Sequence, residues 1–310
     1  MQKQNTKILK QGSWARDFHK NWSLYLMVLP VLAFYAIFCY KPMYGLIMSF
    51  QDFNPRLGFL ESEWVGFEHF RLFFTSSDFP RLLRNTLVIS FSTLIISFPF
   101  PVLLAIFLNE IRSTGFKRTI QTVSYLPHFI SLVVICGMIK TFVSSDGIIG
   151  QLVAVFTGER TNLLLQPKAF TPIYVISKIW QTIGWDSIIY LSALTSIDQQ
   201  MYEAAEIDGA GRFKKMWHIT LPSLKETMIV LLIMGVGGVM SLGYEKIMLL
   251  YSPAIYETSD VISTYVYRTG FGSQNWSYSA AIGLFNSVIN LMLVITANKV
   301  ARKLNGSGLW

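Results

Sequence analysis

Four side chains with different binding groups recur along one predicted helix at a spacing that places them on a single face. They are Lys178, Gln181, Thr182 and Trp185, at positions i, i+3, i+4 and i+7. The ammonium, amide and hydroxyl groups can hydrogen-bond to sugar hydroxyls, and the indole offers a flat apolar surface to a pyranose ring. Lys178 could also bind the carboxylate of an acidic sugar. The stripe therefore predicts a carbohydrate contact inside an apolar segment.

A second interpretation of this stripe is that it packs against a neighbouring helix. Lys178 would then pair with Asp186, or extend its ammonium group toward the membrane surface. Polar side chains within a membrane span are costly and usually face a cavity or a protein partner, so both interpretations stay open. His128, in the preceding apolar segment, is expected to be a packed, hydrogen-bonded residue.

The chain carries no pattern for catalysis. No G-x-x-x-x-G-K-[ST] phosphate loop occurs, and no residues have the spacing of a metal site or a nucleophile–base pair. Cys39 and Cys136 lie in apolar runs far apart, which favours simple packing. Asp186 is the one acid well within a predicted span, so an intramembrane enzyme or an ion-coupled carrier is not favoured. We predict a protein that is not an enzyme and binds no metal or cofactor directly.

A polar stretch, residues 199–222, separates two apolar segments and forms a second candidate site. Residues 203–206, Glu-Ala-Ala-Glu, favour a helix with a shallow face, and the glycines within 209–211 allow a sharp turn with positive φ. Residues 212–218 are expected to resume a helix with apolar contacts, which Leu221-Pro222 then ends. The result would be a stiff elbow that can transmit force. Its candidate contact residues are Glu203, Ala204, Ala205, Asp208, Gly209, Gly211, Phe213 and Trp217.

The composition indicates an all-α membrane protein. Of 310 residues, 52% are hydrophobic and 14% are charged, with a mean hydropathy of +0.42, whereas soluble domains carry about 25% charged residues. A spanning helix needs about 20 apolar residues. Six transmembrane helices are predicted in a single domain, residues 1–310, at about 21–50, 86–109, 119–142, 172–197, 226–242 and 279–298. Pro99 and Pro101 predict a kink in the second.

The distribution of charge predicts the orientation. With six spans, both termini and the 199–222 stretch lie on one side, and that side holds more than half of the 26 Lys and Arg residues. The positive-inside rule makes this side cytoplasmic. No small-residue cleavage site follows the first apolar run, so residues 1–20 are predicted to be a retained cytoplasmic arm. The net charge of +8 comes from residues on the predicted cytoplasmic side, and the basic residues form no stripe with interleaved aromatics. Nucleic acid is therefore not expected as a partner.

Several motifs resemble the permease subunits of bacterial ABC importers over about residues 20–303. The pattern E-A-A-x-x-x-G at 203–209, followed by I-x-L-P at 219–222, resembles the EAA loop of that family. The segments Tyr-Leu-Met-Val-Leu-Pro at 25–30, Lys-Pro-Met-Tyr at 41–44 and Trp-Val-Gly-Phe-Glu-His-Phe at 64–70 are similar to sugar permeases related to the large maltose permease subunit, and most similar to its oligosaccharide and polysaccharide branch. The chain lacks that subunit's extra N-terminal spans and large periplasmic insertion.

The resemblance implies a type I permease fold whose cytoplasmic EAA helices couple to an ATPase. It implies four kinds of partner in the bacterial plasma membrane and beside it: a second permease subunit, two cytoplasmic ATPase subunits that use ATP and Mg, an extracellular solute-binding protein, and an oligosaccharide or polysaccharide substrate. A permease for a non-sugar solute, such as a peptide or amino acid, is the alternative.

The resemblance also implies where substrate is bound. Alignment with the large maltose subunit places Lys178, Gln181, Thr182 and Trp185 on sugar-contacting positions, together with Gly235, Gly238, Val239, Leu242 and Tyr244. The glycines either widen the cavity for a bulky sugar or allow close helix packing. Glu245 and Lys246 either rim the cavity or pair with each other.

Overall fold

The computed structural model describes residues 14–306, 308 and 309, so residues 1–13 of the predicted arm lie outside the described residues. The described chain is mostly helical. The α-helices are α1 (Trp14–Phe34), α2 (Lys41–Met43), α3 (Gly58–Glu61), α4 (Glu68–Thr75), α5 (Phe79–Ser97), α6 (Pro99–Glu110), α7 (Thr114–Phe129), α8 (Leu132–Val143), α9 (Ile148–Thr157), α10 (Pro167–Thr195), α11 (Gln199–Ile207), α12 (Arg212–Lys215), α13 (Leu221–Gly237), α14 (Tyr244–Leu250), α15 (Tyr256–Ser259), α16 (Ile262–Tyr267) and α17 (Trp276–Asn305).

Shorter helical turns and one small sheet complete the described elements. The turns are of the π type in η1 (Tyr35–Tyr40), η4 (Met216–Thr220) and η6 (Arg268–Gly272), and of the 3₁₀ type in η2 (Tyr44–Phe50), η3 (Leu163–Leu165) and η5 (Pro253–Ile255). Strands β1 (Gln51–Asp52) and β2 (Glu63–Trp64) pair antiparallel, with Gln51 opposite Trp64.

Five helical segments of the described chain are long and apolar enough to cross a membrane. They are Asp17–Phe50, Phe79–Glu110, Leu132–Thr157, Arg212–Gly237 and Trp276–Leu304. The predicted fourth span corresponds to α10, which is not among these five. α10 nevertheless has 29 residues, and at 1.5 Å per residue its length of about 43 Å exceeds the hydrocarbon thickness of a bilayer.

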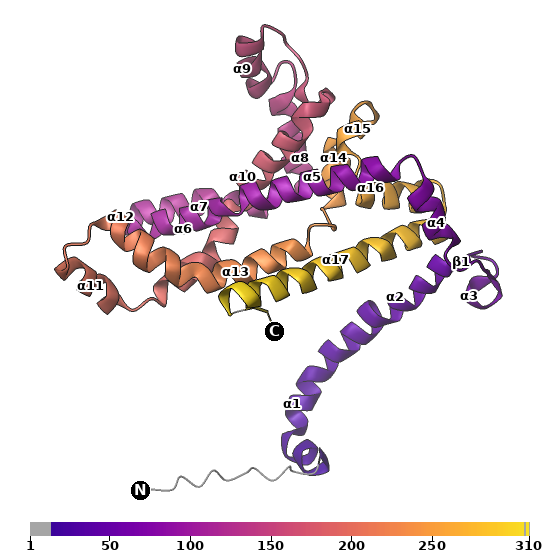
Figure 1. Ribbon diagram of the computed structural model, residues 1–310, viewed down its shortest axis with the longest axis horizontal. Helices are drawn as coiled ribbons and strands as arrows, with labels where there is room; N and C mark the ends of the chain where they lie inside the picture. Colours follow the sequence, from indigo (N-terminus) through magenta and orange to yellow (C-terminus); the bar gives the residue numbers. More distant parts are fainter. Residues whose placement is uncertain (1–13, 307, 310) are drawn as a thin grey trace.

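Helix α10 occupies the middle of the bundle. It contacts α5, α6, α7 and α13, while α13 also packs on α17; Figure 1 shows α5, α6, α13 and α17 running along the length of the molecule. One glycine explains the tight approach of α10 to α7. A Cβ on Gly184 would lie 2.2 Å from the carbonyl oxygen of Ser124, so no larger residue fits without movement of the backbone.

The third predicted span, 119–142, is wrong as a single helix. α7 ends at Phe129, and α8 begins at Leu132 after the hydroxyl of Ser131 accepts a hydrogen bond from the Val134 amide. Pro127 precedes this break, and a proline weakens the helical hydrogen-bond ladder. In the second span, α5 ends at Ser97 and α6 begins at Pro99, while Phe98 between them keeps helical φ and ψ of −57° and −42°. The kink expected from Pro99 and Pro101 therefore stays a prediction.

The fifth span also differs from its prediction. Leu221-Pro222 does not end the preceding helix: residues Arg212–Gly237 form one continuous helical segment through α12, η4 and α13. The π turn η4 finishes two residues before Pro222, and η1 finishes two residues before Pro42 in the same way. A wider turn gives the proline ring room that a regular α-helical turn would deny it. The segment then stops at Gly237, earlier than the predicted 242.

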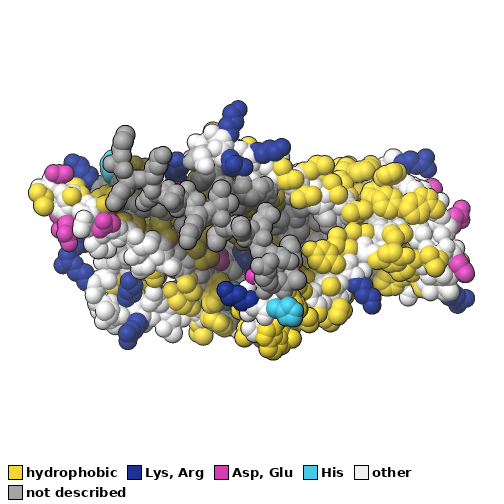
Figure 2. All heavy atoms as spheres, turned by 90° about the horizontal axis from the view of Figure 1, so that it is seen from below, with side chains coloured by type: hydrophobic (Ala, Val, Ile, Leu, Met, Phe, Trp, Pro, Cys, Tyr) yellow, Lys and Arg dark blue, Asp and Glu magenta, His cyan; other side chains and the backbone are white. Residues whose placement is uncertain are grey.

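The surface of the molecule is extensively apolar. No residue in the most apolar window of Asp17–Phe50 is buried, and Figure 1 shows α1 and α2 extending away from the bundle. In Figure 2, apolar side chains cover much of the visible surface, and charged side chains lie at both ends and at several places along the edges between them. α9, at the tip of the projection formed with α8, exposes Val155 and Phe156 almost fully. Such a surface suits lipid or other subunits.

Candidate functional site

A cavity of about 480 Å³ lies between α5, α10 and the residues that follow α13. Its walls come from four parts of the chain and mix hydroxyl, amide, ammonium and backbone groups. They are Ser90, Thr93, Leu94 and Ser97 of α5, Leu132 of α8, Tyr174, Lys178 and Gln181 of α10, and Gly235, Gly238, Val239, Ser241, Leu242, Gly243 and Lys246 of the α13–α14 region.

The wall opposite α10 is a break in the helix, residues 238–243, between α13 and α14. Side chains from other helices satisfy its backbone. Ser90 donates to the carbonyl of Val239, Ser263 to that of Leu242 at 3.1 Å, and Asn286 to that of Met240 at 2.8 Å. Asn290 accepts from the Met240 amide at 3.1 Å and donates to the Ser241 hydroxyl at 2.7 Å. Irregular backbone is tolerated at membrane depth where it lines a cavity and is satisfied in this way.

Two lysines face the cavity. Lys246 is only 4% exposed; its ammonium donates to Gln181 Oε1 at 3.3 Å and lies 5.3 Å from the centre of the Tyr174 ring. Lys178 lines the same space from α10. Within residues 14–306, neither lysine forms an ion pair with an Asp or Glu. The cavity thus has excess positive charge.

The four residues of the predicted stripe on α10 do not all face the same cavity. Lys178 and Gln181 line the cavity, whereas Thr182 is buried within the protein. Trp185 points toward α7, where its ring stacks on His128 at 4.4 Å and meets Phe129 edge-on at 5.5 Å. The close contact at Gly184 brings this side of α10 against α7. Lys178 forms no ion pair with Asp186, which lines an adjoining cavity.

The predicted residues of the fifth span are likewise divided. Gly235, Gly238, Val239 and Leu242 line the cavity. Tyr244 instead stacks on Tyr267 with ring centres 5.6 Å apart, and Glu245 is exposed. Of the two alternatives for Glu245 and Lys246, Lys246 lines the cavity and donates to Gln181, and the two residues form no ion pair with each other.

Sequence reasoning missed the contribution of α5. Ser90, Thr93 and Ser97 follow one another at i, i+3 and i+7, the spacing of one helical face. That polar pattern in an apolar helix was available in the sequence. The inward direction of Lys246 was not, because it depends on how the chain leaves the break at 238–243.

The elbow predicted at 199–222 is present as α11, a turn, and the segment that begins with α12. Gly209 has φ of +75°, the left-handed conformation that favours glycine, whereas Gly211 precedes α12 with φ of −70°. No atom lies within 4 Å of a Cβ built on Gly209. The turn therefore depends on the backbone freedom of Gly209 alone.

Two contacts connect the arms of this elbow. Lys215 donates to Glu206 in an ion pair, and the Tyr202 hydroxyl lies 2.9 Å from that of Thr220. The hydrogen bond from Lys215, together with its charge and that of Arg112, lowers the pKa of the Glu206 carboxyl. The contacts hold α11 against the start of the Arg212–Gly237 segment.

Large apolar side chains remain uncovered on the elbow. Ile207 is 87% exposed, Phe213 82% and Trp217 64%. Glu203, Ala204, Ala205, Asp208 and Gly211 lie beside them on α11 and in the turn. Large exposed apolar side chains among charged neighbours are typical of a protein interaction site.

Comparison with known proteins gives consistent results along the whole chain. The family model of the binding-protein-dependent transport system inner membrane component matches residues 97–306. Protein LplB of Bacillus subtilis (strain 168) is 42% identical over 99% of this chain and 98% of its own length. The polygalacturonan/rhamnogalacturonan transport system permease protein YteP of the same organism is 44% identical over 93% of this chain and 90% of its own.

Solved structures agree. A bacterial ABC transporter involved in the import of the acidic polysaccharide alginate has a chain that is 42% identical, with a TM-score of 0.86, covering 94% of this chain and 99% of that one. A second structure, of a bacterial alginate ABC transporter with an alginate pentasaccharide-bound periplasmic protein, gives 41% identity and a TM-score of 0.87. This chain therefore belongs to the family of binding-protein-dependent transport system inner membrane components, which are membrane-spanning permease subunits of ABC transporters and not themselves enzymes.

Proposed function

We propose that this chain is one of two permease subunits of an ATP-driven importer for oligosaccharide or polysaccharide fragments, and that these fragments carry carboxylates. The observation that carries the proposal is the pair Lys178 and Lys246, two cations that face one cavity without an acidic partner among the described residues. The names of the relatives, a polygalacturonan/rhamnogalacturonan permease and an alginate importer, support sugars over peptides or amino acids.

The electrostatics favour an anionic substrate. Burying the ammonium of Lys246 is costly unless an opposite charge compensates it, and Gln181 supplies only a neutral acceptor. A substrate carboxylate would provide the missing charge. A charge-assisted hydrogen bond contributes about 1.5–3 kcal/mol, so each lysine can change the affinity for an acidic sugar by about tenfold or more.

The remaining architecture is proposed on the same basis. α10 would be the sixth span, since its length suffices and it carries polar side chains because it lines the cavity. Both termini and the elbow would then be cytoplasmic. Two ATPase subunits would use ATP and Mg, and one of them would bind the exposed apolar side chains of this elbow. A second permease subunit would complete the pathway, and an extracellular solute-binding protein would deliver the sugar. The chain itself would bind no cofactor.

The continuous segment Arg212–Gly237 suggests how ATPase motion reaches the substrate. Phe213 and Trp217 lie at its elbow end, and Gly235 and Gly238 line the cavity at its other end. A helix of 26 residues is about 39 Å long. A tilt of ten degrees about its elbow end would move its cavity end by about 7 Å. The break at 238–243 would accommodate this movement.

Uptake by the reconstituted four-subunit transporter tests the proposal. The probes are an oligogalacturonate and the same oligosaccharide with its carboxylates masked as methyl esters, each delivered by the binding protein. Lys178→Met and Lys246→Met should each lower uptake of the acidic form about tenfold or more, and lower uptake of the ester much less. Lys168→Met, at the exposed start of α10, is the matched control and should behave as the wild type. Equal losses for both probes, or none for either, would contradict the proposal.

A further inference from the structure

A second cavity lies beside the first, nearer to the end of α10 that leads into α11. Its volume is about 250 Å³, and it is lined by Leu94, Ser97, Phe98, Pro101, Asp186, Ile189, Tyr190, Leu231 and Gly235. Leu94, Ser97 and Gly235 also line the larger cavity. Because the two cavities share three wall residues, they adjoin one another between α5, α10 and α13.

The charge of this second cavity is opposite to that of the first. Asp186 follows Lys178 by eight positions on α10, about 12 Å along the helix axis. Its carboxylate is exposed in the cavity and forms no ion pair with any cation in residues 14–306. The two lysines therefore line one cavity, and an acid without a counter-charge among the described residues lines the adjoining one.

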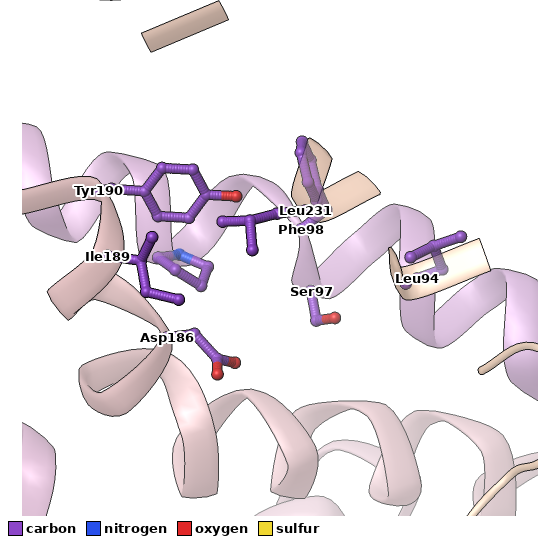
Figure 3. A pocket seen from close by; sticks show the side chains of 9 residues that line it. Leu94, Ser97, Phe98, Asp186, Ile189, Tyr190 and Leu231 are labelled. Carbon is purple, nitrogen blue, oxygen red and sulfur yellow. The ribbon is translucent and has the colours of Figure 1, made fainter. Parts of the chain in front are cut away.

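The neighbours of Asp186 are hydroxyl groups and apolar surface. Figure 3 shows the Asp186 carboxylate and the Ser97 hydroxyl at the lower side of the cavity, with the ring of Tyr190 above them. Ser97 donates its proton to the Thr93 carbonyl at 2.5 Å, which leaves its oxygen lone pairs free to accept. Ile189 and Leu231 supply the apolar wall.

This combination fits the uncharged part of a saccharide. An ionised carboxylate is an acceptor with two oxygens, and it binds donors such as sugar hydroxyls while it repels another carboxylate. An acid within a membrane span is costly and usually faces a cavity or a protein partner.

We propose that Asp186 is a substrate-binding residue that accepts hydrogen bonds from the ring hydroxyls of the sugar, on the α11 side of the two lysines. This inference rests on the proposed import of acidic saccharides and deepens it. A bound fragment would place a carboxylate against Lys178 and Lys246 and the hydroxyls of an adjacent ring against Asp186. The pathway would thus recognise an alternation of charge and hydroxyl groups along the chain of the sugar.

Retention of labelled oligogalacturonate by the assembled transporter tests this inference. The ATPase partner is made hydrolysis-deficient, so that substrate passed on by the binding protein stays in the membrane subunits. Asp186→Leu should lower the retained oligosaccharide about tenfold at limiting concentration, and Asp186→Asn should lower it less, because an amide oxygen still accepts hydrogen bonds. Glu226→Gln, which removes an exposed carboxylate of α13 outside both cavities, is the matched control and should retain the wild-type amount.

Assembly of the complex is measured in parallel. If Asp186 instead pairs with a cation of the second permease subunit, Asp186→Leu will lower the yield of assembled complex, and retention per assembled complex will stay unchanged; that result overturns the inference. Wild-type retention by Asp186→Leu alongside reduced retention by Lys178→Met would overturn it too, and would leave the proposed function standing. Unchanged retention by all the lysine and aspartate variants would remove the proposed function itself.

Discussion

The turn at Gly209 allows the proposed coupling role of the elbow to be tested by backbone conformation alone. Because φ is +75° and no atom lies within 4 Å of a built Cβ, a side chain at this position meets no steric neighbour. The cost of substitution then comes from the left-handed backbone, about 1–2 kcal/mol for an ordinary L-residue. Such a cost lowers the ratio of native to non-native elbow conformations by a factor of about 5–30.

The predicted order of activity does not follow side-chain size. Asn tolerates the left-handed region better than other non-glycine residues, and a β-branched residue tolerates it least. Gly209→Asn should therefore retain most activity, Gly209→Ala should lose about fivefold, and Gly209→Val should lose the most. The measurement is ATPase activity of the purified transporter with and without loaded binding protein. Gly115→Ala, an exposed glycine of α7 with ordinary φ and an open Cβ direction, is the control and should keep wild-type stimulation.

Two results would refute this reasoning in different ways. An order set by volume, with Gly209→Ala more active than Gly209→Asn, would show that the elbow is limited by contacts with a partner and not by its own backbone. Wild-type stimulation in all three variants would show that the conformation of the turn does not matter for coupling. Amounts of co-purified ATPase separate a failure to assemble from a failure to transmit motion.

Two further predictions concern packing and orientation. Gly184→Ala would place a methyl group 2.2 Å from the Ser124 carbonyl oxygen, so it should destabilise the complex by about 1–3 kcal/mol, measured as a lower thermal midpoint, whereas Gly137→Ala on α8, with nothing within 4 Å, should not. In a background with Cys39→Ser and Cys136→Ser, Ser145→Cys should react with an impermeant thiol reagent in intact cells and Thr114→Cys should not; the reverse pattern would invert the proposed orientation.

The sequence supports the prediction of long apolar helices and of the elbow because both depend on local properties. Hydropathy over about 20 residues and the glycine at 209 are sufficient for them. The break between α7 and α8 escaped prediction because residues 119–142 are apolar enough to continue, and only Pro127 and the Ser131 cap indicate the stop. At Pro222 the sequence predicted a helix end that the structure does not have, because a π turn accommodates the proline within a continuous helix.

The candidate site was predicted in part for a similar reason. Helical spacing placed Lys178 and Gln181 correctly on one face. The side chains of such a stripe nevertheless point in several directions around the helix, so they can contact two neighbouring helices. Gly184 decides between them, because its contact with Ser124 turns Trp185 toward α7. No spacing rule could have placed Lys246 beside Gln181, since the two are 65 positions apart and meet through the break at 238–243.

The hydrogen bonds that hold this break have a consequence for biosynthesis. Ser90 lies upstream of residues 238–243 in the chain, whereas Ser263, Asn286 and Asn290 lie downstream. A ribosome therefore delivers the break to the membrane before most of its hydrogen-bond partners exist. Until α17 emerges and inserts, the amide and carbonyl of Met240 have no protein partner in an apolar medium, which is an unfavourable state. Completion of the cavity wall is thus among the last events of synthesis, and a chain truncated before Asn286 would expose an unsatisfied segment that membrane quality control can recognise.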